Sequence, residues 1–293
     1  MTNKFVRYNS LENYWNLEKI MEKYAPHFNR NDLHHWYVTE KLHGSNVCIS
    51  NMYKEGPAFF TRNGNQLPAG YQTVLKTYDW ELLFKLNPGL KFVYGEITGP
   101  KIQKGVDYGD EKKLYIFDYS DGEDYIRIHR QEEGFDYTPI WFTPTAPSSY
   151  DDILNFVLER LSHDPPTALN PKEDNVLEGF VVKCISMPML TDETRFVFKV
   201  KHPKFDEKVR GQKKERAPDD TDYSIVDEYI NDNRVESALS KFPGYKKHQI
   251  GDVMREIVND VKEDMKKDGH RWDKKFQKRI NRFAQKTIVQ GAE

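Results

Sequence analysis

Residues Thr39–Asn46 read TEKLHGSN, and this stretch decides how the first two thirds of the chain are interpreted. The residues leading into it, 36–41, alternate along two faces, which predicts a strand, and an apolar run resumes at 47–49. A lysine where a strand enters a glycine-bearing turn is held rigidly at the mouth of a sheet. An amine attacks only when neutral, so desolvation and nearby cations are needed to activate it. Lys41 is therefore a candidate nucleophile, although a lone lysine before a turn is more often a surface residue.

The composition indicates a globular protein. The 293 residues favour two domains, and 38% apolar with 13% aromatic residues is enough to build cores rather than a disordered chain. Two cysteines, Cys48 and Cys184, make neither a disulfide framework nor a cysteine-rich zinc site, which favours a reducing compartment. No apolar run approaches the roughly 18 residues of a membrane span, and the first residues lack the apolar core of a signal peptide. We expect a soluble cytoplasmic protein without a membrane partner.

The pattern along the chain predicts an α+β domain followed by an all-helical one. The first part is expected to contain helices at 10–24, 71–86 and 150–161, and strands at 36–52 (interrupted), 57–62, 91–97, 113–119, 125–128, 176–185 and 195–201. Residues 208–222 are charged and poor in large apolar residues, and three helical stretches follow at 223–239, 248–267 and 272–289. The expected domains are 1–204 and 223–293, joined by a linker or mobile loop at 205–222.

Charge is unevenly distributed between these parts. From residue 199 onward there are 23 basic and 18 acidic residues, whereas the whole chain has a net charge of -2. Basic residues crowd the end of the chain, with the aromatic residues Trp272, Phe276 and Phe283 between them. The excess is typical of a domain that meets a polyanion, or of a solvated basic face with its aromatic residues inside.

Five further segments accompany the lysine turn in a fixed order. They are Thr61–Gly64 (TRNG), Tyr94–Glu96 (YGE), Tyr115–Asp118 (YIFD), Glu178–Lys183 (EGFVVK) and Phe198–Lys201 (FKVK). Together with KLHGSN they resemble the motifs of ATP-dependent RNA ligases of the type 2 (Rnl2-like) branch of the covalent nucleotidyltransferases. Any one motif is common by chance, whereas six in this order are not. The resemblance spans residues 41–201, and the helical tail matches only in size and position.

The resemblance implies a fold and a reaction. The fold is an antiparallel-sheet nucleotidyltransferase domain enclosing an ATP pocket. The enzyme would move AMP from ATP to Lys41, then to a 5′-phosphate, and a 3′-hydroxyl would displace it to seal RNA, with Mg²⁺ or Mn²⁺ as the metal. The expected partners are RNA ends in a nicked RNA duplex or an RNA–DNA hybrid, and the expected state is a monomer.

The resemblance also implies roles for individual residues. The implied catalytic residues are Lys41, Asn46, Asp118, Glu178, Lys199 and Lys201. The implied cofactor-binding residues are Glu40, Lys41, Arg62, Glu96, Phe117, Lys183, Lys199 and Lys201. Glu178 is also the implied metal ligand, holding Mg²⁺ through water. His43 marks this branch of the family without an implied role, and a histidine that only stabilises the turn fits it equally well.

Alternatives of different classes stay open. A DNA ligase or a capping-type enzyme shares the lysine chemistry, but its motif normally carries Asp-Gly, which is His43-Gly44 here. A non-catalytic RNA-binding module on a ligase fold would be expected to have lost some of the candidate residues. A protein-modifying nucleotidyltransferase is disfavoured only by the basic tail.

Overall fold

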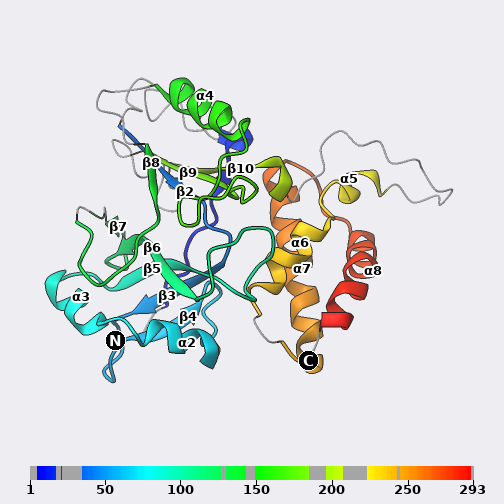
Figure 1. Cartoon of the computed structure of the whole chain (residues 1–293). Coiled ribbons are helices and arrows are strands. Elements are labelled where there is room, and N and C mark those ends of the chain that lie inside the picture. Colours follow the sequence, from blue (N-terminus) through cyan, green and yellow to red (C-terminus); the bar gives the residue numbers. More distant parts are fainter. Residues whose placement is uncertain are drawn as a thin grey trace. The chain divides into compact units, whose positions relative to one another are not determined.

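The computed structural model describes residues 5–17, 21, 35–126, 128, 130–142, 149–184, 196–206, 223–242 and 245–291. The chain divides into two compact units, Met1–His202 and Pro203–Glu293 (Figure 1). The first unit is built on two five-stranded sheets and the second is helical.

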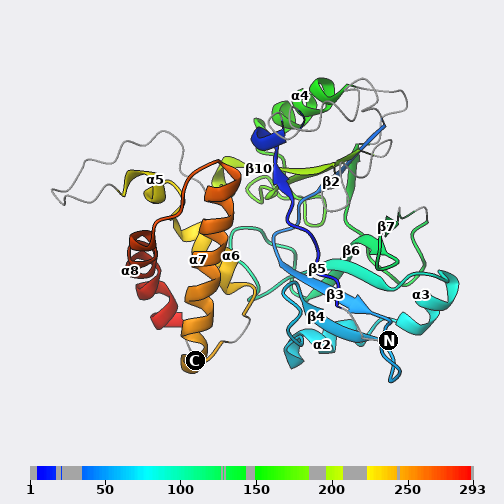
Figure 2. The same cartoon turned by 180° about the vertical axis from the view of Figure 1, so that it is seen from behind.

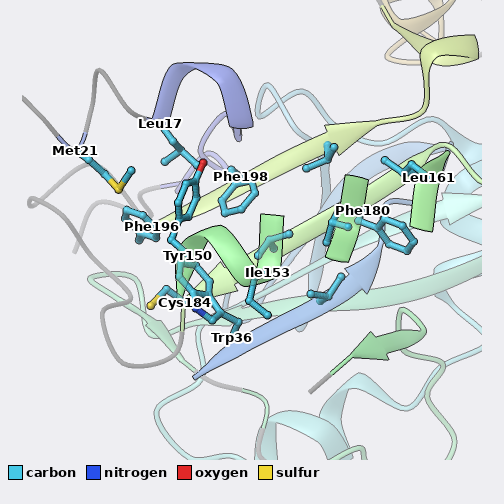
Figure 3. Close-up of a cluster of buried hydrophobic side chains, with 14 of the residues drawn as sticks. Leu17, Met21, Trp36, Tyr150, Ile153, Leu161, Phe180, Cys184, Phe196 and Phe198 are labelled. Atoms are coloured by element: carbon cyan, nitrogen blue, oxygen red, sulfur yellow. The ribbon is translucent and has the colours of Figure 1, made fainter. Parts of the chain in front are cut away.

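The first sheet, sheet A, carries the end of the lysine-bearing strand. Its strands in spatial order are β1 (Glu12–Asn13), β10 (Val197–Lys201), β9 (Gly179–Cys184), β2 (Trp36–Glu40) and β8 (Ile140–Phe142). β1 pairs with β10 in parallel and the other pairs are antiparallel. Helix α4 (Tyr150–Leu161) packs its apolar stripe on one face of this sheet, over the buried Trp36, Phe180 and Phe198 (Figure 3). The opposite face of the sheet is left for polar side chains.

The second sheet, sheet B, is antiparallel throughout. Its strands in spatial order are β4 (Ala58–Thr61), β3 (Ser45–Ser50), β5 (Phe92–Thr98), β6 (Lys113–Ser120) and β7 (Tyr125–Ile126). Helices α2 (Ala69–Leu75) and α3 (Trp80–Leu86) cover one face. The N-terminal segment, residues 5–13, packs Phe5 and Tyr8 on the other face and then reaches sheet A as β1. Figure 2 shows this segment in blue, running between the two sheets.

In the first unit the structure corrects two of the expected helices and adds strands β1 and β8. The helix expected at 10–24 is wrong at its start, because Glu12–Asn13 pair with β10 and Tyr14–Asn16 form a 3-10 turn (η1). Its continuation through residues 18–20 and 22–24 lies outside the described residues. The helix expected at 71–86 is two helices, since the Asp79 side chain accepts a hydrogen bond from the Leu82 N–H and starts α3 afresh. Strand β8 was not expected.

The second unit has a core of its own. Its helical elements are η4 (Pro203–Phe205), α5 (Ser224–Asp227), α6 (Asp232–Leu239), η5 (Lys247–Gln249), α7 (Ile250–Lys267) and α8 (Lys274–Gly291). The helix expected at 223–239 is broken where Asn231 caps α6. Phe276 is buried and Trp272 packs against the core, whereas Phe283 is 38% exposed. The expected linker lies outside the described residues from 207 to 222.

No helix in the described ranges is both long enough and apolar enough to cross a membrane. Both cysteines, Cys48 and Cys184, are free thiols buried in the first unit.

Candidate active site

Lys41 follows directly on strand β2, and the pairing of β2 with β9 fixes its position. Its backbone N–H donates to the Gly179 carbonyl at 2.8 Å, which extends the ladder by one residue. Its Nζ lies 2.7 and 2.8 Å from the two carboxylate oxygens of Glu178, the residue that precedes β9. The candidate nucleophile is therefore held in a two-oxygen ion pair at the end of sheet A.

Glu178 gathers two further basic side chains. Lys201 Nζ lies 3.1 Å from its Oε1, and His43 Nδ1 lies 3.3 Å from its Oε2. Burial of the Glu178 carboxyl opposes its ionisation, but the charges of Lys41, Lys201 and His43 outweigh burial and hold its pKa well below the usual range. Glu178 is therefore an anion at neutral pH, and both of its oxygens contact the Lys41 amine.

The other candidate lysines lie on the face of sheet A that α4 does not cover. Phe198 and Val200 point to the helix side, so strand alternation places Lys199 and Lys201 on the opposite face. Lys199 is paired in register with Val181 of β9 and with Asn13 of β1.

A row of polar residues crosses sheet B at the level of the turn. Asn46 of β3 is paired with Glu96 of β5, and the β3–β4 register places Arg62 on the other side of Asn46. Burial raises the pKa of Glu96 to about 8, and the charge of Glu178 adds to this effect. Glu96 is therefore close to half protonated at mildly alkaline pH.

Two atoms of this row have unused hydrogen-bonding capacity. Arg62 donates from Nη2 to the Ser10 hydroxyl at 2.7 Å, but its buried Nε has no partner among the described residues. The buried Oδ1 of Asn46 likewise has no partner there. A donor and an acceptor left over on neighbouring positions suit a ligand group that both accepts and donates, such as a hydroxyl.

A second cluster links the two sheets through Lys183 of β9. Its Nζ donates to Asp118 Oδ1 at 2.9 Å and to the Phe117 carbonyl at 2.8 Å, and it lies 5.9 Å from the centre of the Phe117 ring. The other oxygen of Asp118 accepts from the Tyr8 hydroxyl at 2.6 Å. The ring of Tyr8 meets that of Phe117 edge-on. Asp118 is thus a buried carboxylate that accepts from Lys183 and from Tyr8, beside the Phe117 ring.

Glu40 is not brought into this group. It shares a strand face with Trp36 and Val38, which pack against α4, so its side chain lies on the opposite face of sheet A from Lys183 and Lys201. Its carboxylate accepts from the Thr167 hydroxyl, the Ala168 N–H and the Trp141 indole, and burial raises its pKa. The expected binding of the cofactor by Glu40 stays a prediction, and the contacts indicate that it anchors the loop at 165–168.

Sequence reasoning missed the loop residues that hold the turn after Lys41. The Tyr108 hydroxyl accepts from the His43 N–H at 2.8 Å, and Gln103 Nε2 donates to the Gly44 carbonyl at 2.7 Å. Both residues lie in the β5–β6 connection, some 60 residues away from the turn. No period, cap or turn signal marks such positions, and only the contact itself reveals them.

Comparison with known proteins agrees with the resemblance. The RNA ligase family model matches residues 34–201, and the model of the T4 RNA ligase 2 C-terminal domain matches residues 214–290. The solved structure of Naegleria gruberi RNA ligase with PPi is similar at a TM-score of 0.50 and 21% identity, covering 70% of this chain and 58% of that one. A mutant of the same ligase with ATP and Mn gives 0.50 and 22%, with the same coverage. The chain thus aligns with less than two thirds of these relatives' length.

Proposed function

The chain belongs to the RNA ligase family, and from this premise we propose that it is an ATP-dependent ligase that joins RNA 3′-hydroxyl and 5′-phosphate ends through AMP carried on Lys41. The observation that carries the proposal is the placing of Lys41 against Glu178, with Lys201 and His43 on the same carboxylate. All four residues fall inside the span of the family match. The similar ligase solved with ATP and Mn supports the choice of nucleotide.

The proposed first step exchanges partners around Glu178. An entering triphosphate offers its own negative charge to Lys199 and Lys201, and this loosens the contact of Lys201 with the Glu178 carboxylate. Lys41 must also give up one proton, to solvent, before its nitrogen can attack. The N–P bond to the α-phosphorus then forms as the P–O bond to pyrophosphate breaks, in the in-line geometry of phosphoryl transfer.

Glu178 is the carboxylate at this site that could ligate a divalent metal. In the described part of the chain, no three His, Cys, Asp or Glu side chains gather to hold a metal by themselves. Glu178 offers two oxygens, both of which contact cations. This arrangement fits a metal ligated mainly by nucleotide phosphates and water, with Glu178 as its protein ligand. Such a metal would neutralise charge on the phosphates.

The nucleoside is proposed to lie between the two sheets. The Phe117 ring would stack on the base. Lys183 holds the Phe117 backbone through its carbonyl and pairs with the charge of Asp118. The row of Arg62, Asn46 and Glu96 has the unused donor and acceptor that a ribose hydroxyl would satisfy.

The sealing steps require the enzyme to bind RNA in addition to the nucleotide. The C-terminal helices support this part of the proposal, because Lys274, Lys278 and Arg282 are exposed on one face of α8. A nicked duplex is the proposed substrate, since these three side chains, spaced along one face of α8, suit the regular phosphate backbone of an RNA duplex. We further propose that one copy of the chain acts alone.

Labelling the protein with ATP tests the proposal. Native protein incubated with α-labelled ATP and a divalent metal, then denatured, is expected to keep label on the chain. Lys41→Ala is expected to keep none, because the attacking nitrogen is gone. Lys85→Ala, an exposed lysine on α3, serves as the matched control and is expected to label like the native protein.

A negative result must be separated from a site that is already filled. Protein that takes no label is first treated with pyrophosphate, which removes AMP carried over from expression. No label after that treatment would refute the ligase proposal. Where label appears, RNA and DNA ends presented as nicks, hybrids and single strands then decide the substrate, and label from GTP instead of ATP would point to a capping-type enzyme.

A further inference from the structure

The connection between β5 and β6, residues 99–112, lies over the turn that follows Lys41. Its two side chains at this point engage consecutive residues of the turn: Tyr108 accepts from the His43 N–H and Gln103 donates to the Gly44 carbonyl. One peptide N–H and one peptide carbonyl of a short turn are therefore held by the same loop.

Steric crowding holds the turn from the other side. A side chain at Gly44 would collide with the Ile97 carbonyl and with Glu96 of strand β5. The turn is thus pressed against β5 and bonded to the loop that leaves β5 at its end. This arrangement holds the backbone of the turn, from which the His43 ring reaches Glu178, with Nδ1 3.3 Å from Oε2.

The loop over the turn is itself tied to the segment that leads to Glu178. The Asn175 side chain accepts from the Asp107 N–H at 2.8 Å, and it donates to the carbonyls of Asp107 and Asn170. Asp107 precedes Tyr108, and Asn175 lies three residues before Glu178. The Asn175 amide therefore joins the loop that holds the His43 turn to the segment that leads to Glu178.

Tyr108 keeps its proton in this setting. Burial raises the pKa of Tyr108 well above its usual value, and the negative charges of Glu40, Glu178 and Glu96 add to the effect. The group that accepts from His43 is therefore a neutral phenol. A phenylalanine in its place would retain the ring and remove only this acceptor.

We propose that Tyr108 is a positioning residue for the transfer of AMP to Lys41, acting through the His43 turn. It holds the turn so that His43 shares the Glu178 carboxylate with Lys41 and Lys201. This inference rests on the proposed function. It assigns Tyr108 a role in the geometry around the Glu178 carboxylate, through its bond to the His43 N–H, and no role in holding the nucleotide.

Single-turnover labelling of Tyr108→Phe tests the inference. Loss of one hydrogen bond to a buried N–H is expected to slow lysyl-AMP formation at saturating ATP by about tenfold. The ATP concentration for half-maximal rate is expected to stay within about twofold of native, because no nucleotide contact is lost. Tyr119→Phe is the matched control: its hydroxyl bonds Tyr137, 2.8 Å away, in the same unit and away from the turn.

A double-mutant cycle separates positioning from plain structural support. In a His43→Ala background the path from Tyr108 to Glu178 is cut, so adding Tyr108→Phe is expected to cost little more than His43→Ala alone. Additive losses, or a native rate in Tyr108→Phe, would overturn the inference.

Two further results keep the outcome decisive. If Tyr108→Phe does not fold, Gln103→Leu removes the other contact to the turn and is expected to give the same slowed rate at unchanged half-saturation. A native rate in that variant would then overturn the inference. Absence of label in native protein would instead count against the proposed function.

Discussion

At the level of single residues, burial sets the charge state of Glu96. Its pKa of about 8 in the folded chain stands against an ordinary value near 4.5. Glu178 stays ionised because three basic groups surround it. Ionised Glu96 would be a buried second negative charge near Glu178, so its pKa is raised. Two carboxyl groups that interact with each other therefore differ in protonation at neutral pH.

Stability against pH is expected to report this difference. The folded state binds the Glu96 proton more tightly than the unfolded state, so the contribution is full below about pH 4.5 and is lost as pH rises through about 8. Glu96→Gln removes this loss. Its unfolding free energy relative to native protein is expected to rise across that window, by at most about 1.4 kcal/mol per pH unit.

Urea denaturation at several pH values measures the effect. The exposed Glu55→Gln is the control and is expected to run parallel to the native protein. Parallel curves for Glu96→Gln as well would show that Glu96 titrates normally in the fold.

Some of these residues were within reach of sequence reasoning and some were not. Lys41 and Glu178 were both expected at the site, and the structure brings them into contact. Whether they act as proposed is still a prediction. The alternation of β2 already placed Glu40 beside Trp36, on the face away from the site, and the family resemblance alone did not use that information. Tyr108 had no signal, because its partner is 65 residues away.

At the level of elements, the sequence predicted a helix correctly where the segment contains its own capping residue and apolar periodicity. Helix α4 was predicted from Tyr150 to Leu161 and is found there, because Ser149 caps it in a capping box and its apolar residues recur at helical spacing. The expected helix from Ser10 was wrong at its start because the deciding partner is strand β10, almost 190 residues later. Pairing with a distant edge strand overrides local periodicity.

The N-terminal segment makes a prediction at this level. Tyr8 donates a hydrogen bond to one oxygen of buried Asp118, so Tyr8→Phe removes that donor. We expect unfolding free energy to fall by about 1–3 kcal/mol in urea denaturation. Tyr53→Phe, whose ring packs on Phe60, is the control and is expected to change little. A loss no greater than the control's would mean that water replaces the Tyr8 hydroxyl.

At the level of the whole molecule, each unit has a separate core and a separate task is proposed for each. The first unit holds every candidate active-site residue, and the second presents the exposed basic face of α8. Opposite that face, Phe276, Ile280 and Ala284 are buried, so the helix can lose surface charge without losing its packing.

Charge removal on α8 is expected to separate binding from labelling. Replacing Lys274, Lys278 and Arg282 by alanine should weaken RNA binding and reduce the salt slope by about one per residue. Lysyl-AMP formation should be unchanged. The measurement is affinity for a nicked RNA duplex at several salt concentrations, with the exposed Lys54, Lys76 and Lys85 replaced as the charge-matched control. Equal losses in both triple variants would mean that net charge, rather than this face, attracts RNA.

Both native thiols are buried, so site-specific labelling does not require that the native cysteines first be replaced. Cys48 and Cys184 are buried, and burial raises the pKa of the Cys48 thiol, so neither offers an accessible thiolate to a maleimide or a spin label. A cysteine introduced at exposed Lys85 and another at exposed Lys274 would then be the reactive pair. Dyes at these positions would report the distance between the two units during a single turnover, with the native chain as an unlabelled background.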